Sequence, residues 1–240
     1  FSRDGKAWQQ VAVPHDWAIS GPFDKKWDLQ MVAIEQNGET EKTEKSGRSG
    51  ALPWIGEGMY KMNWTAPKGY KRAVLVFDGA MSQPVVSVNG KEAGKWAYGY
   101  NAFRIDITPF IQFGKSNLIE VHLNNVEESS RWYPGGGLYR PVSVELYGNE
   151  NFSTWDTFVR TLKADKQEAE VEVNALLEGK TGKSGKTVIA LLDEAGKKVA
   201  EQTVTGANPE IKTTLKVANP QLWSPESPYL YQVKLTRYEG

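Results

Sequence analysis

The sequence predicts an all-β protein built from a jelly-roll β-sandwich followed by an immunoglobulin-like β-sandwich. Along most of the chain, apolar residues alternate with polar ones or form short continuous runs, and both patterns are typical of strands. The 23 glycines and 12 prolines separate these runs, and almost no segment shows the 3.6-residue period of an amphipathic helix. A polar break at 148–151 predicts the boundary, which gives domains at 1–149 and 150–240.

The first domain has about eight predicted strands and one long early loop, which favours a jelly roll. Residues 72–79 form a continuous apolar run, so we expect this strand to be covered on both faces. Asn89-Gly90 predicts a two-residue hairpin turn. Residues 8–13 alternate like an edge strand, and the length of loop 20–58 points to a functional loop. The remaining strands are expected within 59–65, 85–91, 96–108, 117–125 and 142–147.

The second domain is predicted from shorter strands that recur every 8–12 residues or so, with turn residues between them. Because the chain has no cysteine, this immunoglobulin-like sandwich would lack a disulfide. Trp223 lies in a proline-rich segment before the last strand and is expected to cap the core. The other strands are expected at 157–163, 169–177, 187–192, 198–204 and 211–217.

Composition excludes several classes of function. The 29 Lys and Arg residues balance 29 Asp and Glu residues, whereas nucleic acid and anionic membranes require a basic face, so we predict neither partner. No apolar run approaches the roughly 20 residues of a membrane span. With no cysteine and two histidines, we predict no cofactor and no metal site, although a calcium ion held by backbone carbonyls and an Asp is compatible with the sequence. Phe1 is not a natural start, so we expect the natural chain to begin upstream, and a missing leader is uninformative.

The segment 129–140, SSRWYPGGGLYR, is the strongest candidate for binding chemistry. Consecutive glycines let the backbone adopt positive φ and approach a partner closely. Aromatic faces and arginine side chains suit flat, hydroxyl-rich ligands, which favours Arg131 and Trp132 as binding residues. The structural alternative, a stiff corner that plugs the end of a β-core, applies to Tyr133, Leu138 and Tyr139.

Three further polar residues have structural interpretations. His15 and Asp16 follow Pro14, and no serine is placed to complete a catalytic triad with them. We therefore favour hydrogen bonds that brace the loop over direct ligand contact. His122 alternates with apolar neighbours on its strand and is predicted to lie at the surface.

Three segments resemble glycoside hydrolase family 2, the β-galactosidase and β-glucuronidase group. They are PHDW at 14–17, SRWYPGGGLYR at 130–140 and LWSPESPYLY at 222–231, in the family's order. The resemblance implies an amino-terminal sugar-binding jelly roll and an immunoglobulin-like domain. In the family, a (β/α)₈ barrel with both catalytic carboxyl groups follows; we expect it to be absent here. Asn149-Glu150 mimics the family's general-acid pair but lies in the predicted linker, so we interpret it as a coincidence.

The resemblance also implies a candidate sugar site. In the family, loops of the first domain reach over the mouth of the barrel and help to hold the terminal sugar. This implies a sugar- or carboxylate-facing role for Arg131 and a stacking or interdomain role for Trp132. The loop that begins at Asp24 is the other candidate, with Trp27 and Trp54 as platforms. No catalytic residue is predicted within the chain.

The function implied is the non-catalytic amino-terminal region of a β-galactosidase-like glycoside hydrolase that acts on terminal β-linked sugars of oligo- or polysaccharides. The chain itself is expected to be inactive, supporting the barrel and shaping its substrate pocket. The implied partners are carbohydrate and the carboxy-terminal barrel of the parent chain, with a homo-oligomer of the intact enzyme left open. A bacterial periplasmic or secreted location is expected. The alternatives are a free-standing carbohydrate-binding protein and a purely structural or oligomerising piece.

Overall fold

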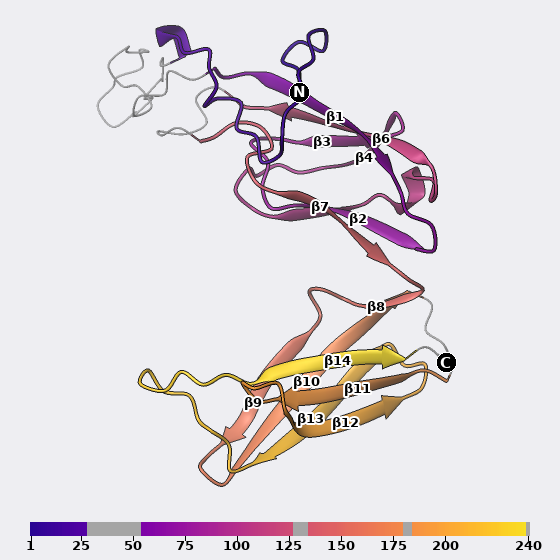
Figure 1. The fold of residues 1–240 in the computed structure, drawn as a ribbon, viewed down its shortest axis with the longest axis vertical. Coiled ribbons are helices and arrows are strands. Elements are labelled where there is room, and N and C mark those ends of the chain that lie inside the picture. The colour runs from indigo at the N-terminus through magenta and orange to yellow at the C-terminus, as the bar shows by residue number, and fades with distance from the viewer. Residues whose placement is uncertain (28–53, 127–133, 180–183, 239–240) are drawn as a thin grey trace, which may run out of the picture. The chain divides into compact units, whose positions relative to one another are not determined.

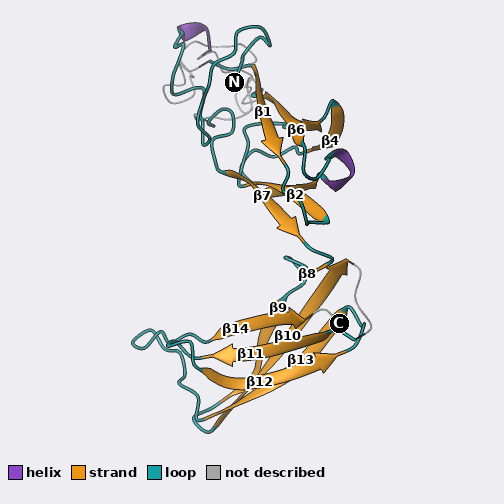
Figure 2. Ribbon diagram, turned by 45° about the vertical axis from the view of Figure 1, so that its right-hand side comes forward, coloured by secondary structure: helices purple, strands orange, loops and turns teal. Residues whose placement is uncertain are grey.

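The computed structural model describes residues 1–27, 54–126, 134–179 and 184–238, and over these residues the chain is all-β (Figure 1). It divides into two compact units, Phe1–Leu146 and Tyr147–Gly240. Helical structure in the described residues is limited to the 3₁₀ turns η1 (Lys25–Trp27) and η3 (Thr108–Phe110) (Figure 2). No helix in this part of the chain is long and apolar enough to cross a membrane.

The first unit is a sandwich of two sheets (Figure 1). One sheet has the order β1-β6-β3-β4, and the other has the order β5-β2-β7. Their bounds are β1 (Glu57–Thr65), β2 (Arg72–Phe77), β3 (Val85–Val88), β4 (Lys91–Lys95), β5 (Phe103–Asp106), β6 (Ser116–Asn124) and β7 (Val142–Tyr147).

Local patterns in this unit match the sequence predictions at several points. In β2, the neighbouring residues Val74 and Leu75 are both buried, which confirms that this strand is covered on both faces. Asn89 and Gly90 have φ values of 52° and 76° between β3 and β4, as the predicted hairpin turn requires. His122 lies on the outer face of β6, with Nε2 at 3.2 Å from Glu57 Oε2.

The predicted edge strand at 8–13 is wrong, because this segment forms no strand. The backbone of Gln9 is bonded instead to Phe1: the Phe1 ammonium group donates to Gln9 O (2.8 Å), and Gln9 N donates to Phe1 O (2.9 Å). The chain therefore folds back on itself here rather than pairing with a sheet. Alternation alone does not provide a strand with a partner.

The second unit is also a sandwich of antiparallel sheets. In one sheet, β10 pairs with β13, β8 and β9, and the other sheet has the order β12-β11-β14. Their bounds are β8 (Glu150–Phe152), β9 (Phe158–Ala164), β10 (Glu168–Gly179), β11 (Lys186–Leu192), β12 (Lys198–Thr205), β13 (Glu210–Ala218) and β14 (Gln232–Tyr238). The two sheets enclose an apolar core that includes Val173, Ile189 and Leu215.

The expectation for Trp223 is wrong. Trp223 is 58% exposed, at an apolar groove that residues of both sheets also line. Glu150 was expected in the linker between the domains, but it belongs to a strand. It begins β8, its side chain is 2% exposed, and Oε2 is 2.7 Å from Nε of Arg237 on β14.

Candidate functional site

The described part of the glycine-rich corner, from Pro134 onward, is hydrogen-bonded to the segment that contains His15 and Asp16. His15 N donates to Leu138 O (2.7 Å), and Trp17 N donates to Gly136 O (3.1 Å). The side chain of Asp16 accepts from Gly136 N (3.2 Å) and from Ala18 N (3.0 Å). Two of the motifs singled out in the sequence therefore form one structural unit.

Close packing explains why glycine is needed in this corner. A Cβ atom at Gly136 would overlap the indole of Trp17, which is fully buried. A Cβ atom at Gly137 would overlap the hydroxyl group of Tyr60, and the φ of +91° at Gly137 is itself unfavourable for other residues. The glycines here allow a close approach between backbone and aromatic rings of the same chain.

Tyr60 Oη joins the two segments beneath the corner. It lies 2.7 Å from His15 Nδ1 and 3.2 Å from His15 O, and it accepts a weaker bond from Leu138 N (3.4 Å). Burial raises the pKa of the Tyr60 phenol and lowers the pKa of His15. A neutral imidazole can accept a hydrogen bond from the Tyr60 hydroxyl group through Nδ1, so these pKa shifts are compatible with the short contact between the two groups. His15 and Asp16 thus make the bracing hydrogen bonds that the sequence interpretation favours.

An aromatic cluster surrounds this hydrogen-bond network. The ring of Phe1 lies 5.0 Å from the rings of His15 and Tyr60 and 5.5 Å from that of Trp17. Trp54 packs against Trp17 at 5.5 Å. Such contacts fix the positions of the rings and therefore of the corner.

The structure separates the predicted site residues. Asp24 directly precedes the η1 turn, which contains Trp27: Asp24 Oδ1 accepts from Lys26 N (3.0 Å), and Lys26 Nζ lies 4.5 Å from the centre of the Trp27 ring. The bond from the Lys26 backbone lowers the pKa of the exposed Asp24 carboxyl. Trp54 belongs to the aromatic cluster instead. Arg131 and Trp132 lie outside the described residues.

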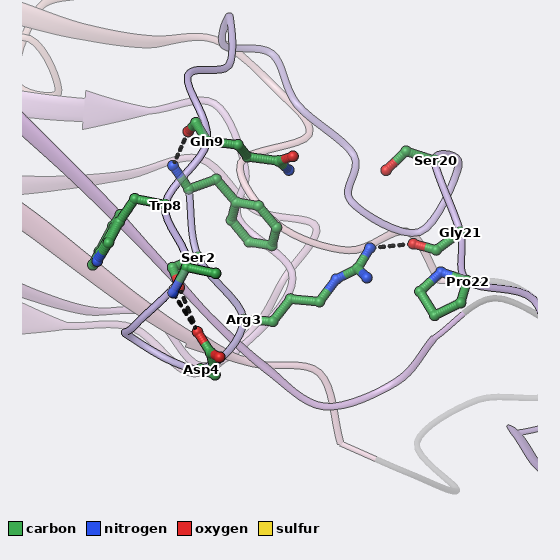
Figure 3. Close-up of a pocket in the computed structure, with 10 residues that line it drawn as sticks. Ser2, Arg3, Asp4, Trp8, Gln9, Ser20, Gly21 and Pro22 are labelled. Atoms are coloured by element: carbon green, nitrogen blue, oxygen red, sulfur yellow. Dashed lines mark hydrogen bonds between the residues drawn. The ribbon is translucent and has the colours of Figure 1, made fainter.

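Sequence reasoning missed Arg3. Its guanidinium lies 5.0 Å from the centre of the Trp54 ring and donates to Gly21 O, while Nε is buried with no hydrogen-bond partner among the described residues. Burial lowers the pKa of this side chain. Figure 3 shows Arg3 extending to Gly21. Both residues line an open cleft of about 710 Å³, together with Asp4 and Trp8. The only local signal, Arg3-Asp4-Gly5, is typical of a turn and indicates neither contact.

The residues on both sides of 127–133 are firmly held. Asn125 donates from its backbone to Gly56 O (3.0 Å) and from its side-chain amide to Gly135 O (3.0 Å). Gly137 and Met81 exchange two backbone hydrogen bonds of 2.8 and 3.0 Å. In the described part of the chain, no group of three or more His, Cys, Asp or Glu residues could hold a metal ion.

Comparisons with known proteins agree on one family. Residues 153–240 match the family model described as glycosyl hydrolases family 2. A protein of Formosa agariphila is 32% identical over 99% of the chain, which covers 21% of that protein. A β-galactosidase of Bacteroides ovatus is 32% identical over 93% of the chain, which covers 26% of it. A β-glucuronidase of Formosa agariphila is 25% identical over 94% of the chain and is covered to 24%.

A solved structure gives the same result at the level of the fold. A glycosyl hydrolase family 2 member from Bacteroides cellulosilyticus superimposes with a TM-score of 0.79 and 31% identity. The match covers 98% of this chain and 30% of that one. The chain therefore spans about a fifth to a quarter of the length of the curated relatives that it matches.

Proposed function

Since the chain belongs to glycoside hydrolase family 2, we propose that it is the non-catalytic amino-terminal region of a β-galactosidase-like glycosidase. In this role it supports the catalytic barrel and contributes loops to the pocket for a terminal β-linked sugar. Its partners are then the carbohydrate substrate and the barrel of the parent chain.

The observation that carries this proposal is the union of two family motifs in one corner. The backbone of 15–17 is hydrogen-bonded to that of 136–138, and Tyr60 fixes both segments from below. Asn125 and Gly135 hold the two sides of 127–133, the segment that carries Arg131 and Trp132. Fixed flanking residues on rigid elements favour the presentation of side chains to a substrate.

We assign hydrolysis of the glycosidic bond to the catalytic barrel and not to this chain. Glycoside hydrolysis needs two carboxyl groups about 5–10 Å apart on either side of the scissile bond. Glu150, the carboxylate that mimics the family's general acid in sequence, is buried in a salt bridge with Arg237. It is therefore engaged in structure and is not open to a substrate.

Hydrolysis of nitrophenyl glycosides tests the proposal directly. The 240-residue chain is expected to release no nitrophenol from β-galactosides or β-glucuronides, whereas the protein extended by its barrel is expected to hydrolyse one of them. Turnover by the 240-residue chain would contradict the proposal. Calorimetric titration supplies the second test: micromolar binding of galactosides by this chain alone would favour a free-standing carbohydrate-binding protein.

The role of Arg131 is tested in the extended protein. Arg131→Ala is expected to raise KM by about tenfold or more, because a charge-assisted hydrogen bond to the substrate is lost. Arg140→Ala is the matched control, since this exposed arginine donates to backbone carbonyls of Asp78 and Tyr100. Equal effects of the two substitutions on KM would contradict a contact between Arg131 and the substrate.

A further inference from the structure

A group of exposed aromatic residues lies in the loop between β4 and β5 of the first unit. Trp96 and Tyr98 are 41% and 57% exposed, and the ring of Tyr100 lies 5.6 Å from that of Tyr98. No charged residue occurs in the segment 96–103. Exposed aromatic rings that are gathered in this way mark a site of contact with another molecule.

Trp96 is held in place by a stack of rings that begins in the core. Phe77 is fully buried, and its ring lies nearly parallel to that of Phe103 at 4.6 Å. The indole of Trp96 stacks in turn on Phe103 at 5.6 Å, with 8° between the planes. The backbone N–H of Trp96 also donates to Pro84 O (3.0 Å). A ring that is fixed in this way loses little conformational entropy when a ligand binds to its exposed part.

The last two residues of the glycine-rich corner, Tyr139 and Arg140, hold the rest of this loop. Tyr139 Oη donates to Gly99 O (2.9 Å), and Arg140 Nη1 donates to Tyr100 O (3.1 Å). Burial raises the pKa of the Tyr139 phenol; Arg140 opposes this shift, and the nearby phenols of Tyr100 and Tyr98 add to it. The three phenol groups therefore lie near one another beside the exposed rings.

Strand register shows at which end of the sandwich this loop lies. β4 ends at Lys95, which pairs with Val85 at the start of β3. Val85 in turn pairs with His122, close to the end of β6 at Asn124. The chain therefore leaves β4 and β6 at the same end of this sheet. The aromatic loop belongs to the end of the sandwich from which the chain continues towards the candidate sugar-binding residues.

The chemistry of this surface fits an uncharged sugar. A sugar ring presents C–H groups on its faces and hydroxyl groups around its edge, so it can stack on an aromatic ring and bond to phenols. Tyr and Trp provide both contacts on side chains with few rotamers. An acidic sugar would favour a free cation, whereas the guanidinium of Arg140 is bonded to the carbonyl groups of Asp78 and Tyr100.

We propose that Trp96, Tyr98 and Tyr100 form a second sugar-binding site, which holds an uncharged unit of an oligosaccharide beyond the terminal sugar that is cleaved. This inference rests on the proposed function, under which this end of the sandwich faces the substrate. It names the substrate class of the intact enzyme, which is a neutral β-linked chain of several sugars. The binding energy of the remote unit is available in the transition state and therefore raises kcat/KM for longer chains.

The chain-length preference of the longer protein tests the second site. kcat/KM for a β-linked galactotetraose is expected to exceed that for the corresponding galactobiose by about tenfold or more. Tyr98→Ala is expected to reduce this ratio to about one, because the remote sugar unit loses its contact. Both substrates are measured on one preparation, so a loss of folded protein cancels in the ratio.

Two further variants make the test specific. Tyr70→Ala is the matched control, because this exposed tyrosine lies between β1 and β2 at the opposite end of the sandwich. It should keep the ratio of the parent protein, whereas Trp96→Ala is expected to lower the ratio as Tyr98→Ala does. A ratio near one in the parent protein would overturn the proposal. A ratio that neither Trp96→Ala nor Tyr98→Ala lowers would also overturn it.

The second site and the proposed function can fail separately. Hydrolysis of nitrophenyl β-galactoside without a preference for the longer chain would retain the proposed function and reject the second site. A longer protein without glycosidase activity would reject the proposed function. Where no galactoside is hydrolysed, calorimetric titration with galactotetraose decides the second site instead. Binding that Tyr98→Ala weakens by about tenfold or more would retain the site, and absence of binding would reject it.

Discussion

Tyr60 carries a hydroxyl group into the interior of the first unit, where it touches both segments of the corner. Tyr60→Phe keeps the ring but leaves Leu138 N and His15 without their bonds to Oη. The free energy of unfolding is expected to fall by about 1–3 kcal/mol, the usual cost of unpaired buried polar groups. Urea denaturation measures this, with the exposed Tyr70→Phe as the control that should change stability by less than about 0.5 kcal/mol. Equal effects of the two variants would contradict the assigned role.

The pKa of His15 predicts how the stability of the first unit changes at acidic pH. Burial lowers its pKa in the folded state, so between the folded pKa and the unfolded value near 6.5 the unfolded chain binds more protons. Stability from the neutral ring is therefore present above about pH 6.5 and is lost as the pH falls through the folded pKa. Of the neighbouring charges, the amino terminus and Arg3 add to this shift and Asp16 opposes it.

Denaturation at pH 7.5 and at pH 5 checks this response. His15→Gln is expected to make the loss of stability between the two pH values smaller than in the parent chain, because the proton-linked group is gone. An unchanged loss in His15→Gln would show that other groups govern the acid response.

At the scale of elements, the sequence predicted the turns and strands that interactions between neighbouring residues determine. The Asn89-Gly90 turn and the doubly covered strand at 72–77 follow from the residues themselves. β8 was missed because its residues, Glu150–Phe152, are polar at the start and resemble a linker. Its partners are distant in the chain: Glu150 is paired with Arg237, 87 positions away, and the strand pairs with the end of β10. The Arg3–Trp54 contact escaped prediction for the same reason.

Removing one partner of the salt bridge between β8 and β14 is expected to lower the stability strongly. Replacing both partners by apolar residues is expected to lower it less. The side chains of Glu150 and Arg237 are 2% and 8% exposed, so Glu150→Gln leaves a buried arginine unneutralised and should cost about 3–5 kcal/mol. The double variant Glu150→Leu, Arg237→Leu is expected to recover part of that loss. Urea denaturation measures both effects, and Lys198→Met, which breaks an exposed pair with Glu201, should cost less than about 1 kcal/mol. A double variant less stable than Glu150→Gln would contradict this account.

On the scale of the whole molecule, each unit has its own apolar core. One includes Trp17, Phe77 and Leu123, and the other includes Val173, Ile189 and Leu215. A unit with a separate core can unfold by itself. We therefore predict two transitions in calorimetry of the 240-residue chain.

Variants assign these two transitions. Gly136→Ala forces a methyl group against Trp17, which should cost about 1–3 kcal/mol and lower one transition by several degrees. Glu150→Gln should lower only the other transition. Gly148→Ala is the control, because a Cβ atom there meets nothing within 4 Å. One transition that both variants lower equally would mean that the two cores unfold as a single cooperative structure, and the domains predicted at 1–149 and 150–240 would then have no separate stability.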